Sequence, residues 1–454
     1  MQRRTGTREQ GCAGCRVGGA EIGDRSAGES GGGRREAGEL REERADVTQE
    51  ENDLTMQTTH DVVIIGAGPA GCTAGEALAR DGFDVALVEE HAVIGEPVDC
   101  TGVLGGEAFQ RFDLPREIVV GEIGAVTLHS PGGVPITHEA GRPFAYVVDR
   151  AAFDRTLARR ATGAGATLYL STRAVRVGRN PAGVRVECRQ SSQEPVHLSA
   201  KLLVLAGGPQ FRFQEDLGLG ISPVLWQSAH AELPGNGVSH PQVYLGKDVA
   251  PGAFAWAVPV KRGGRSFVRV GVNSRTDAPR YLRRLCAERF SHLTPEGEPF
   301  IPRAWVVPIV PLARTFGERV LAVGDAAGQV KATSGGGIYF GMLGARMAAE
   351  TAADALRRGE CGPEGLASYE KRWRGFLGLE LRLGSLLRRL FSRMADGDVD
   401  QLFRGLQREI RMGHLAGRVS FDWHQGLIFS LLRHPSLVRL LLRNCWDRSA
   451  VAAE

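Results

Sequence analysis

The pattern of hydrophobic and polar positions changes after residue 55. Residues 1–55 contain no Phe, Trp or Tyr and are rich in Gly, Glu and Arg. Such a segment cannot bury enough apolar surface to offset the entropy that is lost on ordering. We therefore predict a disordered tail over 1–55 and a folded part that begins at residue 56.

A short apolar run with β-branched residues, Asp61 to Ile65, opens the folded part and predicts a parallel strand covered on both faces. A glycine-rich turn follows directly, and a helix of small and apolar residues extends from it through Arg80. A second apolar run, Val85 to Val88, ends at Glu89. This order of elements, within about 30 residues, predicts a Rossmann unit that binds a dinucleotide.

The residues of the glycine-rich turn have separate roles in this prediction. Gly66 permits the tight turn, Gly68 lets the backbone approach a pyrophosphate, and Gly71 allows the helix to pack closely. Ala70 lies in the same turn, and Glu89 is placed to accept hydrogen bonds from a ribose. This unit alone does not distinguish between FAD and NAD as the ligand.

A second change from strand to glycine-rich turn occurs late in the chain. Arg319 to Val323 reads as a strand that runs into Gly324-Asp325-Ala326-Ala327-Gly328. Asp325 could serve there simply as a helix N-cap. The segment also resembles the second flavin fingerprint of the para-hydroxybenzoate hydroxylase superfamily, in which the Asp holds the ribityl chain. Because it occurs together with the first turn, it favours FAD, with Gly324 and Asp325 as cofactor-binding residues.

Three further segments carry a closer resemblance. Gly95 to Gly102 reads GEPVDCTG, Phe254 to Pro259 reads FAWAVP, and Ala332 to Ile338 reads ATSGGGI. They are similar to the PxxCxG, YxWxFP and PTSGGGI motifs of the geranylgeranyl reductase family, and the resemblance runs from about Asp61 to Arg411. It implies an FAD-dependent reductase that saturates carbon–carbon double bonds of a geranylgeranyl or other polyprenyl group on a lipid, quinone or related substrate.

The resemblance also implies the fold. We expect an α/β protein, α+β overall, with a Rossmann-type FAD-binding domain, an inserted antiparallel-sheet substrate domain and a C-terminal helical region. The FAD-binding domain would occupy 56–208 and 311–357, the substrate domain 209–310 and the helical region 358–454.

The family pattern assigns further site residues. Cys100 would lie against the flavin ring as the candidate catalytic residue, with Thr101 and Val103 also at the cofactor, and Phe254 and Trp256 would contact the substrate. From the residues alone, a free cysteine is more often a small buried hydrophobe, and aromatics on an alternating strand usually pack in the core.

The remaining cofactor contacts carry alternatives too. The family pattern implies that Arg150 binds the flavin phosphates, but its helical spacing also suits a surface salt bridge with Asp154. The backbone of Val175 would face the adenine. Gly336, Gly337 and Ile338 would approach the isoalloxazine ring at the positive end of a helix over 338–350, with a flexible hinge as the alternative.

One departure from the superfamily concerns the electron donor. Gly207 stands where an Ala-Asp-Gly segment usually has Asp, and no second GxGxxG follows a strand. NADPH, NADH, a ferredoxin and a deazaflavin therefore all remain as electron donors. If the donor is a ferredoxin, the protein has a redox partner.

Two Leu-rich stripes among arginines, 383–391 and 427–442, mark the C-terminal helices. Basic amphipathic helices contact anionic bilayers, although such stripes more often pack on their own domain. No window has the roughly 18 apolar residues of a membrane span. We expect a cytoplasmic protein, with peripheral contact to the cytoplasmic face of the membrane as a hypothesis.

Composition excludes several classes of partner. The net charge of +4 comes mostly from scattered Arg, so nucleic acid is not indicated. Eight cysteines show no disulfide framework, as in a reducing cytoplasm. Cys12 and Cys15 have CxxC spacing but no second ligand pair nearby, so we predict no metal site.

Two other functions fit the same residues. A flavin monooxygenase or halogenase would share the fold, and a halogenase would need a reactive Lys facing its substrate. The lysines after the tail are Lys201, Lys247, Lys261, Lys331 and Lys371. A non-catalytic flavin- or lipid-binding protein is the remaining alternative.

Overall fold

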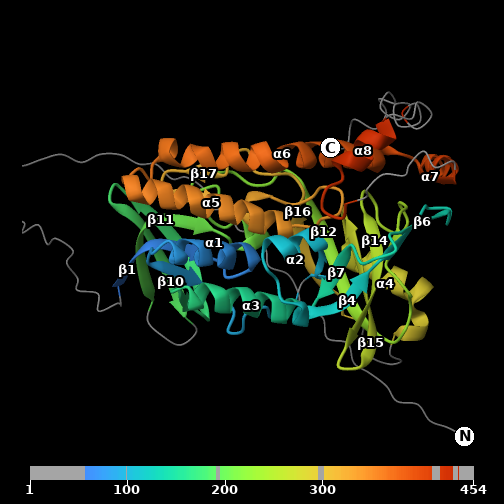
Figure 1. The fold of residues 1–454 in the computed structure, drawn as a ribbon, viewed down its shortest axis with the longest axis horizontal. Helices are drawn as coiled ribbons and strands as arrows, with labels where there is room; N and C mark the ends of the chain where they lie inside the picture. The colour runs from blue at the N-terminus through green and yellow to red at the C-terminus, as the bar shows by residue number, and fades with distance from the viewer. Residues whose placement is uncertain are drawn as a thin grey trace, which may run out of the picture. The chain divides into compact units, whose positions relative to one another are not determined.

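A computed structural model describes residues 57–98, 100–190, 195–294, 301–411 and 420–432, with residue 438. The predicted disordered tail, 1–55, lies outside the described residues together with its CxxC pair. The described part divides into a mostly parallel sheet with helices, a second large sheet and a small third sheet (Figure 1).

The eight-stranded first sheet is that of the predicted Rossmann unit. In spatial order its strands are β17 (Phe316–Gly317), β18 (Val320–Ala322), β11 (Val196–Leu205), β1 (Gln57–Ile65), β2 (Val85–Val88) and β8 (Thr167–Tyr169), and the hairpin of β9 (Thr172–Asn180) and β10 (Gly183–Gln190) pairs with β11. The strands from β18 to β8 run parallel. Every residue of β2 is buried, as the continuous apolar run predicts.

The described helices pack against both large sheets and against one another. They are α1 (Pro69–Arg80), α2 (Gly106–Arg111), α3 (Arg150–Gly163), α4 (Ala278–Arg289), α5 (Ile338–Arg358), α6 (Pro363–Arg393), α7 (Asp396–Arg411) and α8 (Gln425–Leu432), with short 3-10 turns η1 (Arg116–Ile118), η2 (Gly208–Gln210), η3 (Ser291–Leu293) and η4 (Gly324–Ala327). Figure 1 shows α5 and α6 side by side, with α1 packed against α5. Among the described helices, none combines the length and hydropathy needed to cross a bilayer.

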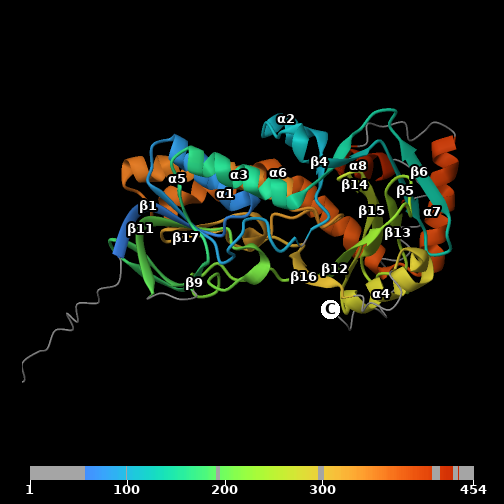
Figure 2. The same ribbon diagram turned by 90° about the horizontal axis from the view of Figure 1, so that it is seen from below.

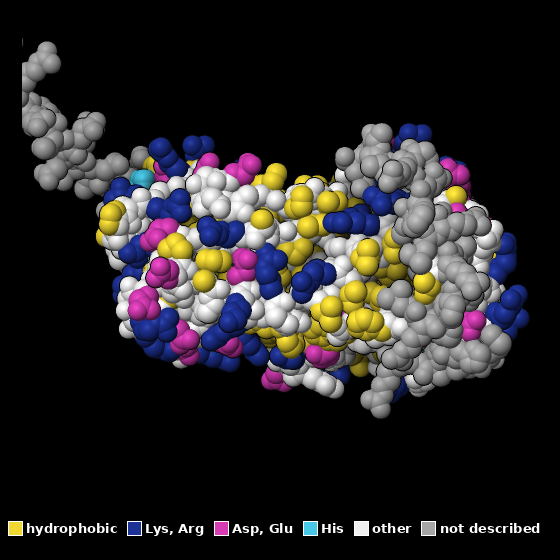
Figure 3. Space-filling view, turned by 90° about the horizontal axis from the view of Figure 1, so that it is seen from above, with side chains coloured by type: hydrophobic (Ala, Val, Ile, Leu, Met, Phe, Trp, Pro, Cys, Tyr) yellow, Lys and Arg dark blue, Asp and Glu magenta, His cyan; other side chains and the backbone are white. Residues whose placement is uncertain are grey.

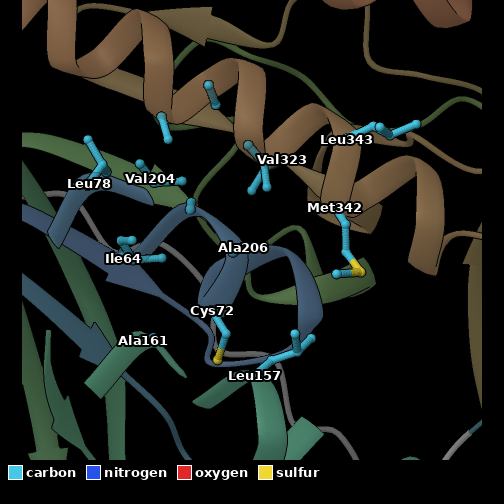
Figure 4. Close-up of a cluster of buried hydrophobic side chains, with 14 of the residues drawn as sticks. Ile64, Cys72, Leu78, Leu157, Ala161, Val204, Ala206, Val323, Met342 and Leu343 are labelled. Atoms are coloured by element: carbon cyan, nitrogen blue, oxygen red, sulfur yellow. The ribbon is translucent and has the colours of Figure 1, made fainter. Parts of the chain in front are cut away.

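The core of the Rossmann unit joins these helices to the sheet. Ile64 of β1, Cys72 of α1, Leu157 of α3 and Met342 of α5 belong to one buried cluster (Figure 4). Small residues on α1 let the neighbouring helices come close. The cluster therefore fixes the turn between β1 and α1, where the first predicted site residues lie.

The seven-stranded second sheet is the predicted antiparallel sheet. In spatial order its strands are β16 (Arg303–Pro308), β12 (Leu225–Pro234), β15 (Arg265–Ser274), β14 (Phe254–Arg262), β13 (Gln242–Tyr244), β5 (Ala125–His129) and β6 (Pro135–Glu139). Only β13 and β5 pair in parallel. Figure 2 shows α4 against this sheet, where Leu282 and Leu285 are buried in one cluster with Val268 and Val270.

A third sheet of β3 (Val103–Gly105), β7 (Ala145–Val148) and β4 (Val119–Ile123) lies between the two large ones, since β4 also contacts β14. The predicted fold class is confirmed. The domain boundaries stay a prediction. β5 and β6, which lie within the first predicted FAD-binding segment, 56–208, belong to the second sheet.

Candidate functional site

A cavity of about 680 Å³ lies where β1, β2, β11 and β18 end. Parallel α/β sheets bind ligands at this edge. The predicted cofactor-binding residues that line it are Gly66, Gly68, Ala70, Glu89, Cys100, Arg150, Gly324, Asp325, Gly337 and Ile338. Segments more than 200 residues apart along the sequence thus form one cavity.

Three backbone segments meet at the glycine-rich turn. Gly66 has a φ of +100°, and a Cβ there would overlap the carbonyl group of Ala206. A Cβ on Gly71 would overlap the carbonyl oxygen of Gly66. By contrast, nothing lies within 4 Å of the position that a Cβ on Gly68 would take, so the cavity is open beside the start of α1.

Glu89 lies at the end of β2 and lines the cavity. Its carboxylate accepts hydrogen bonds from the backbone N–H of Ala67 (3.0 Å) and of His91 (3.0 Å). The Nδ1 atom of His91 lies 2.6 Å from the same carboxylate. These contacts orient Glu89 beside the turn that would hold the pyrophosphate, as its predicted contact with a ribose requires.

Arg150 begins α3 and lines the cavity beside Cys100. Its Nη2 lies 2.9 Å from Oδ2 of Asp154, and Nε lies 3.3 Å from Oδ1. The two side chains are only 13% and 10% exposed. Arg150 therefore forms the salt bridge with Asp154 that its spacing allows. The prediction that this salt bridge lies on the surface is wrong. The Arg150 guanidinium also interacts with the Cys100 thiol.

The loop that carries Cys100 is fixed by the second sheet. The indole N–H of Trp256 donates to the hydroxyl of Thr101 (2.9 Å), and Arg269 donates to the Thr101 carbonyl (2.7 Å). The Cys100 sulfur accepts a hydrogen bond from the N–H of Gly102 (3.4 Å). The PxxCxG-like and YxWxFP-like segments, which are remote in sequence, thus contact each other directly.

Several predicted residues do not line the cavity. Gly71 packs inside α1, and Thr101 and Trp256 form the contact just described. Val103, on β3, packs in the same cluster as Trp256. Phe254 packs with Trp226, whose ring lies beside Gly335 in the segment Gly335 to Gly337, here called the glycine loop. The other two are Val175, 37% exposed on β9, and Gly336, which lies against the Lys331 side chain.

Asp325 and the glycine loop meet at the start of α5. A Cβ on Gly337 would stand 2.5 Å from Oδ1 of Asp325, so any side chain at position 337 would clash with this carboxylate. Burial raises the pKa of Asp325 to about 6, although the positive charge of Arg150 acts in the opposite direction. A half-buried carboxylate that receives no hydrogen bond from the described residues is unfavourable, and the hydroxyls of a ribityl chain would supply donors here.

Sequence reasoning missed a cluster of polar side chains behind the glycine loop. Lys331 forms a buried ion pair with Asp422 (2.9 Å), and its ammonium lies 4.7 Å from the centre of the Phe421 ring. Glu107 accepts hydrogen bonds from the Tyr339 hydroxyl (2.6 Å) and the Trp423 indole (2.7 Å). The one signal in the sequence was a lysine inside an apolar flavin-type segment.

The residues present suit a flavin dinucleotide. The turn at Gly68 is open where we expect the pyrophosphate, Glu89 lies beside that turn as its predicted contact with a ribose requires, and no described group donates a hydrogen bond to the Asp325 carboxylate. Gly335 and Gly337 line the same cavity near Cys100. Among the described residues, no cluster of His, Cys, Asp or Glu has the arrangement of a metal site.

Comparison with known proteins identifies relatives over most of the chain. The family model described as FAD dependent oxidoreductase matches residues 61–208. A digeranylgeranylglycerophospholipid reductase from Methanothrix thermoacetophila is 32% identical over 77% of this chain and 92% of its own length. One from Methanothermobacter thermautotrophicus, reductase 2, is 32% identical over 84% of this chain and 98% of its own.

Solved structures show the same fold at lower identity. A geranylgeranyl bacteriochlorophyll reductase-like protein from Thermoplasma acidophilum matches with a TM-score of 0.75 and 22% identity, covering 86% of this chain and all of that one. A flavin-dependent brominase matches with a TM-score of 0.61 and 17% identity, covering 78% and 93% of the two chains.

The glycines of the turn provide a matched pair of variants. Gly71→Ala should destabilise the flavin-free protein by about 1–3 kcal/mol, because the new methyl group overlaps a backbone carbonyl. Gly68→Ala should leave its stability unchanged and weaken FAD binding about tenfold or more, because the methyl group projects into the cavity. Calorimetry and flavin fluorescence titration measure the two effects. Equal losses of stability in both variants would contradict this assignment.

Asp325→Asn should have opposite effects on the flavin-free and loaded protein. Because the folded-state pKa of Asp325 is raised, the folded protein binds a proton that the unfolded chain has lost, so stability falls as pH rises from 4 through 6. In the flavin-free form, the asparagine variant should therefore have a higher melting temperature than wild type at pH 8 and the same melting temperature at pH 4. Its affinity for FAD should fall about tenfold or more.

The control for this comparison is Asp113→Asn, at an exposed position between α2 and η1. It should shift neither the melting temperature nor the affinity. A destabilised flavin-free Asp325→Asn protein at pH 8 would show that the carboxylate is needed by the fold itself.

Proposed function

This chain belongs to the digeranylgeranylglycerophospholipid reductase family of FAD-dependent oxidoreductases, and we propose that it saturates carbon–carbon double bonds of a geranylgeranyl or other polyprenyl group on a lipid. One observation carries the proposal beyond the family. The loop of Cys100 lies at the flavin cavity and is bound to Trp256 of the antiparallel sheet. A substrate on that sheet would thus be close to the flavin.

The proposed reaction needs a hydride and a proton at neighbouring carbons. Bound FAD, once reduced, would supply the hydride, which carries both electrons of the reduction. An isolated alkene is a poor hydride acceptor, so a proton must be delivered as charge develops. Cys100 is our candidate for a residue at the reacting atoms, with Arg150 as its neighbour. Phe254 and Trp256, on β14 of the same sheet, are the candidate substrate contacts.

The donor that reduces the flavin is a separate part of the proposal. Gly207 lines the cavity in place of the usual aspartate. Its lack of a side chain removes one polar contact from that edge and favours no particular donor. NADPH, NADH, a ferredoxin and a deazaflavin are therefore to be compared directly, by the rate at which each bleaches the oxidised flavin absorbance.

The geometry does not favour a halogenase. The described residues that line the flavin cavity include no lysine. Lys331, the lysine nearest to the glycine loop, is buried in its ion pair with Asp422. Its ammonium is thus committed to a carboxylate rather than directed at a substrate.

The assay that tests the function uses the full-length flavoprotein, reduced with dithionite under anaerobic conditions and given geranylgeranyl lipids. Mass spectrometry should show a gain of two mass units per reduced double bond. Cys100→Ala should lower the rate at least about tenfold, and Cys361→Ala, at a buried position outside the cavity, should not. Oxygenated product under air would support a monooxygenase, and the absence of any product would support a carrier.

We also propose that α6 makes peripheral contact with the cytoplasmic face of a membrane. Phe376, Leu379 and Leu386 are 42%, 46% and 54% exposed, and Leu383 and Leu390 continue their spacing along one face of the helix. Exposed arginines, among them Arg382 and Arg389, flank the stripe. Figure 3 shows hydrophobic side chains grouped between Lys and Arg side chains on this side of the molecule. Such a surface suits an anionic bilayer.

Flotation with vesicles tests this contact. The protein should float with vesicles that contain phosphatidylglycerol and less with neutral ones, and high salt should weaken the binding. Leu386→Asp should abolish flotation, whereas Ile301→Asp, at a residue 79% exposed elsewhere, should not. Equal flotation of both variants would show that α6 is not the contact.

A further inference from the structure

The two faces of the antiparallel sheet differ in chemistry. One face carries Val268, Val270 and Val272 of β15 and packs against α4. The opposite face of the same strand carries Arg269, Gly271 and Asn273, because side chains alternate along a strand. This second face is turned toward Cys100, since Arg269 donates to the neighbouring carbonyl of Thr101.

Residues that pair across the sheet define a continuous polar strip on this second face. Ser228 of β12 pairs with Asn273 on one side and with Trp305 of β16 on the other. His230, two residues along β12, pairs with Gly271. Directly paired residues of antiparallel strands lie on one face, about 4.5–5.5 Å apart. Ser228, His230 and Asn273 are therefore neighbours.

The strip lies between two cavities. Trp305 and Val307 line the flavin cavity, whereas His230 lines a second cavity of about 490 Å³. Cys100 and Arg150 line both. The His230 and Trp305 rings meet edge to face with centroids 4.7 Å apart. The strip thus passes from the second cavity toward the flavin cavity.

Several polar atoms in and beside the strip are buried and lack a hydrogen-bond partner in the part of the chain that the structure describes. Ser228, Asn273 and His230 are 1%, 4% and 7% exposed. Oγ of Ser228, Oδ1 of Asn273 and Nδ1 of His230 have no hydrogen-bond partner among the described residues, and the same holds for the neighbouring Trp226 Nε1. Buried polar atoms are rarely left unpaired in folded proteins, and ordered water usually satisfies those that no protein group reaches.

The other end of the strip lies at the glycine loop. A Cβ on Gly335 would stand 3.1 Å from Nδ2 of Asn273 and 3.7 Å from the Trp226 ring. Gly335 itself lines the flavin cavity. A group held by Ser228 and Asn273 would therefore adjoin the part of the cavity where we expect the flavin ring.

We propose that Ser228, Asn273 and His230 hold ordered water between the two cavities, and that this water supplies the proton for the alkene reduction. The inference rests on the proposed function. The alkene π bond breaks and two C–H bonds form, one with the hydride from the reduced flavin and one with a proton from the water. The hydride carries both electrons away from the reduced flavin, and the hydroxide that remains takes a proton from solvent that enters through the second cavity.

Ser228, Asn273 and His230 are positioning residues in this scheme, because they act through the water. The chain offers a matched control in Thr351, whose hydroxyl in α5 is also buried and without a partner among the described residues. Thr351→Val removes a hydroxyl away from both cavities, and Ser228→Ala removes one from the strip.

The first experiment is independent of turnover. A high-resolution crystal structure of the wild-type flavoprotein should show water within hydrogen-bonding distance of Ser228 Oγ and Asn273 Oδ1. Ser228→Ala should lose that water. The Thr351→Val variant should melt at or above the wild-type temperature, because valine replaces a buried hydroxyl away from both cavities with an apolar group of the same shape, and Ser228→Ala should melt below it. A dry strip, or a Ser228→Ala protein that gains stability, would overturn the proposal.

The second experiment follows single turnovers of the dithionite-reduced protein with a geranylgeranyl lipid. Ser228→Ala and Asn273→Ala should slow product formation about tenfold or more, with little change in the lipid concentration for half-maximal rate. Ser228→Thr keeps the hydroxyl and should retain most of the rate. Unchanged rates in both alanine variants would refute the proton role.

The two experiments separate failure of this inference from failure of the proposed function. If wild-type protein forms no reduced lipid, the proposed function fails and the proton role fails with it. If wild type reduces the lipid and the alanine variants match it, only the proton role is refuted.

Discussion

The geometry of the site depends on one buried guanidinium, that of Arg269. It donates to the carbonyl oxygens of Thr101 (2.7 Å) and Val148 (3.0 Å) and pairs with Glu232 (2.9 Å). Thr101 follows Cys100, and Val148 precedes Arg150 by two residues. A buried charge is tolerated only when its hydrogen bonds are made. The antiparallel sheet is therefore held where Arg269 reaches both carbonyls, and that position sets Cys100 and Arg150 beside it.

The Rossmann unit could be predicted because the features that form it, apolar runs and glycines at close backbone contacts, are recognisable in short stretches of sequence. Continuous apolar runs need burial on both faces, and Gly66 and Gly71 fit only where two backbones nearly touch. The family resemblance also assigned Asp325 and Gly337, and the two residues contact each other across 12 residues of sequence. In these cases the residue type itself is restricted by the contact that it makes.

Arg269 and the polar strip could not be predicted in this way. An arginine in an apolar strand gives no indication of which carbonyls it will reach, because its partners are set by the packing of two sheets. Ser228, His230 and Asn273 are ordinary strand residues until the pairing of β12 with β15 places them side by side. The Arg150 salt bridge was assigned to the surface for the same reason, since helical spacing gives the partner and not the burial.

The C-terminal segment is part of the framework of the site rather than an appendage. Asp422 pairs with Lys331, and the Thr333 hydroxyl lies 2.6 Å from Nδ1 of His424. Glu380 of α6 accepts from the backbone N–H of His424 (2.8 Å), and burial lowers the pKa of His424 to about 4, so the ring stays neutral beside the Lys331 charge. Lys331 and Thr333 immediately precede the glycine loop. Because Lys331, Asp422 and Glu380 are buried, displacing this segment would leave their charged groups without these partners, and the loop would lose its support behind the flavin cavity.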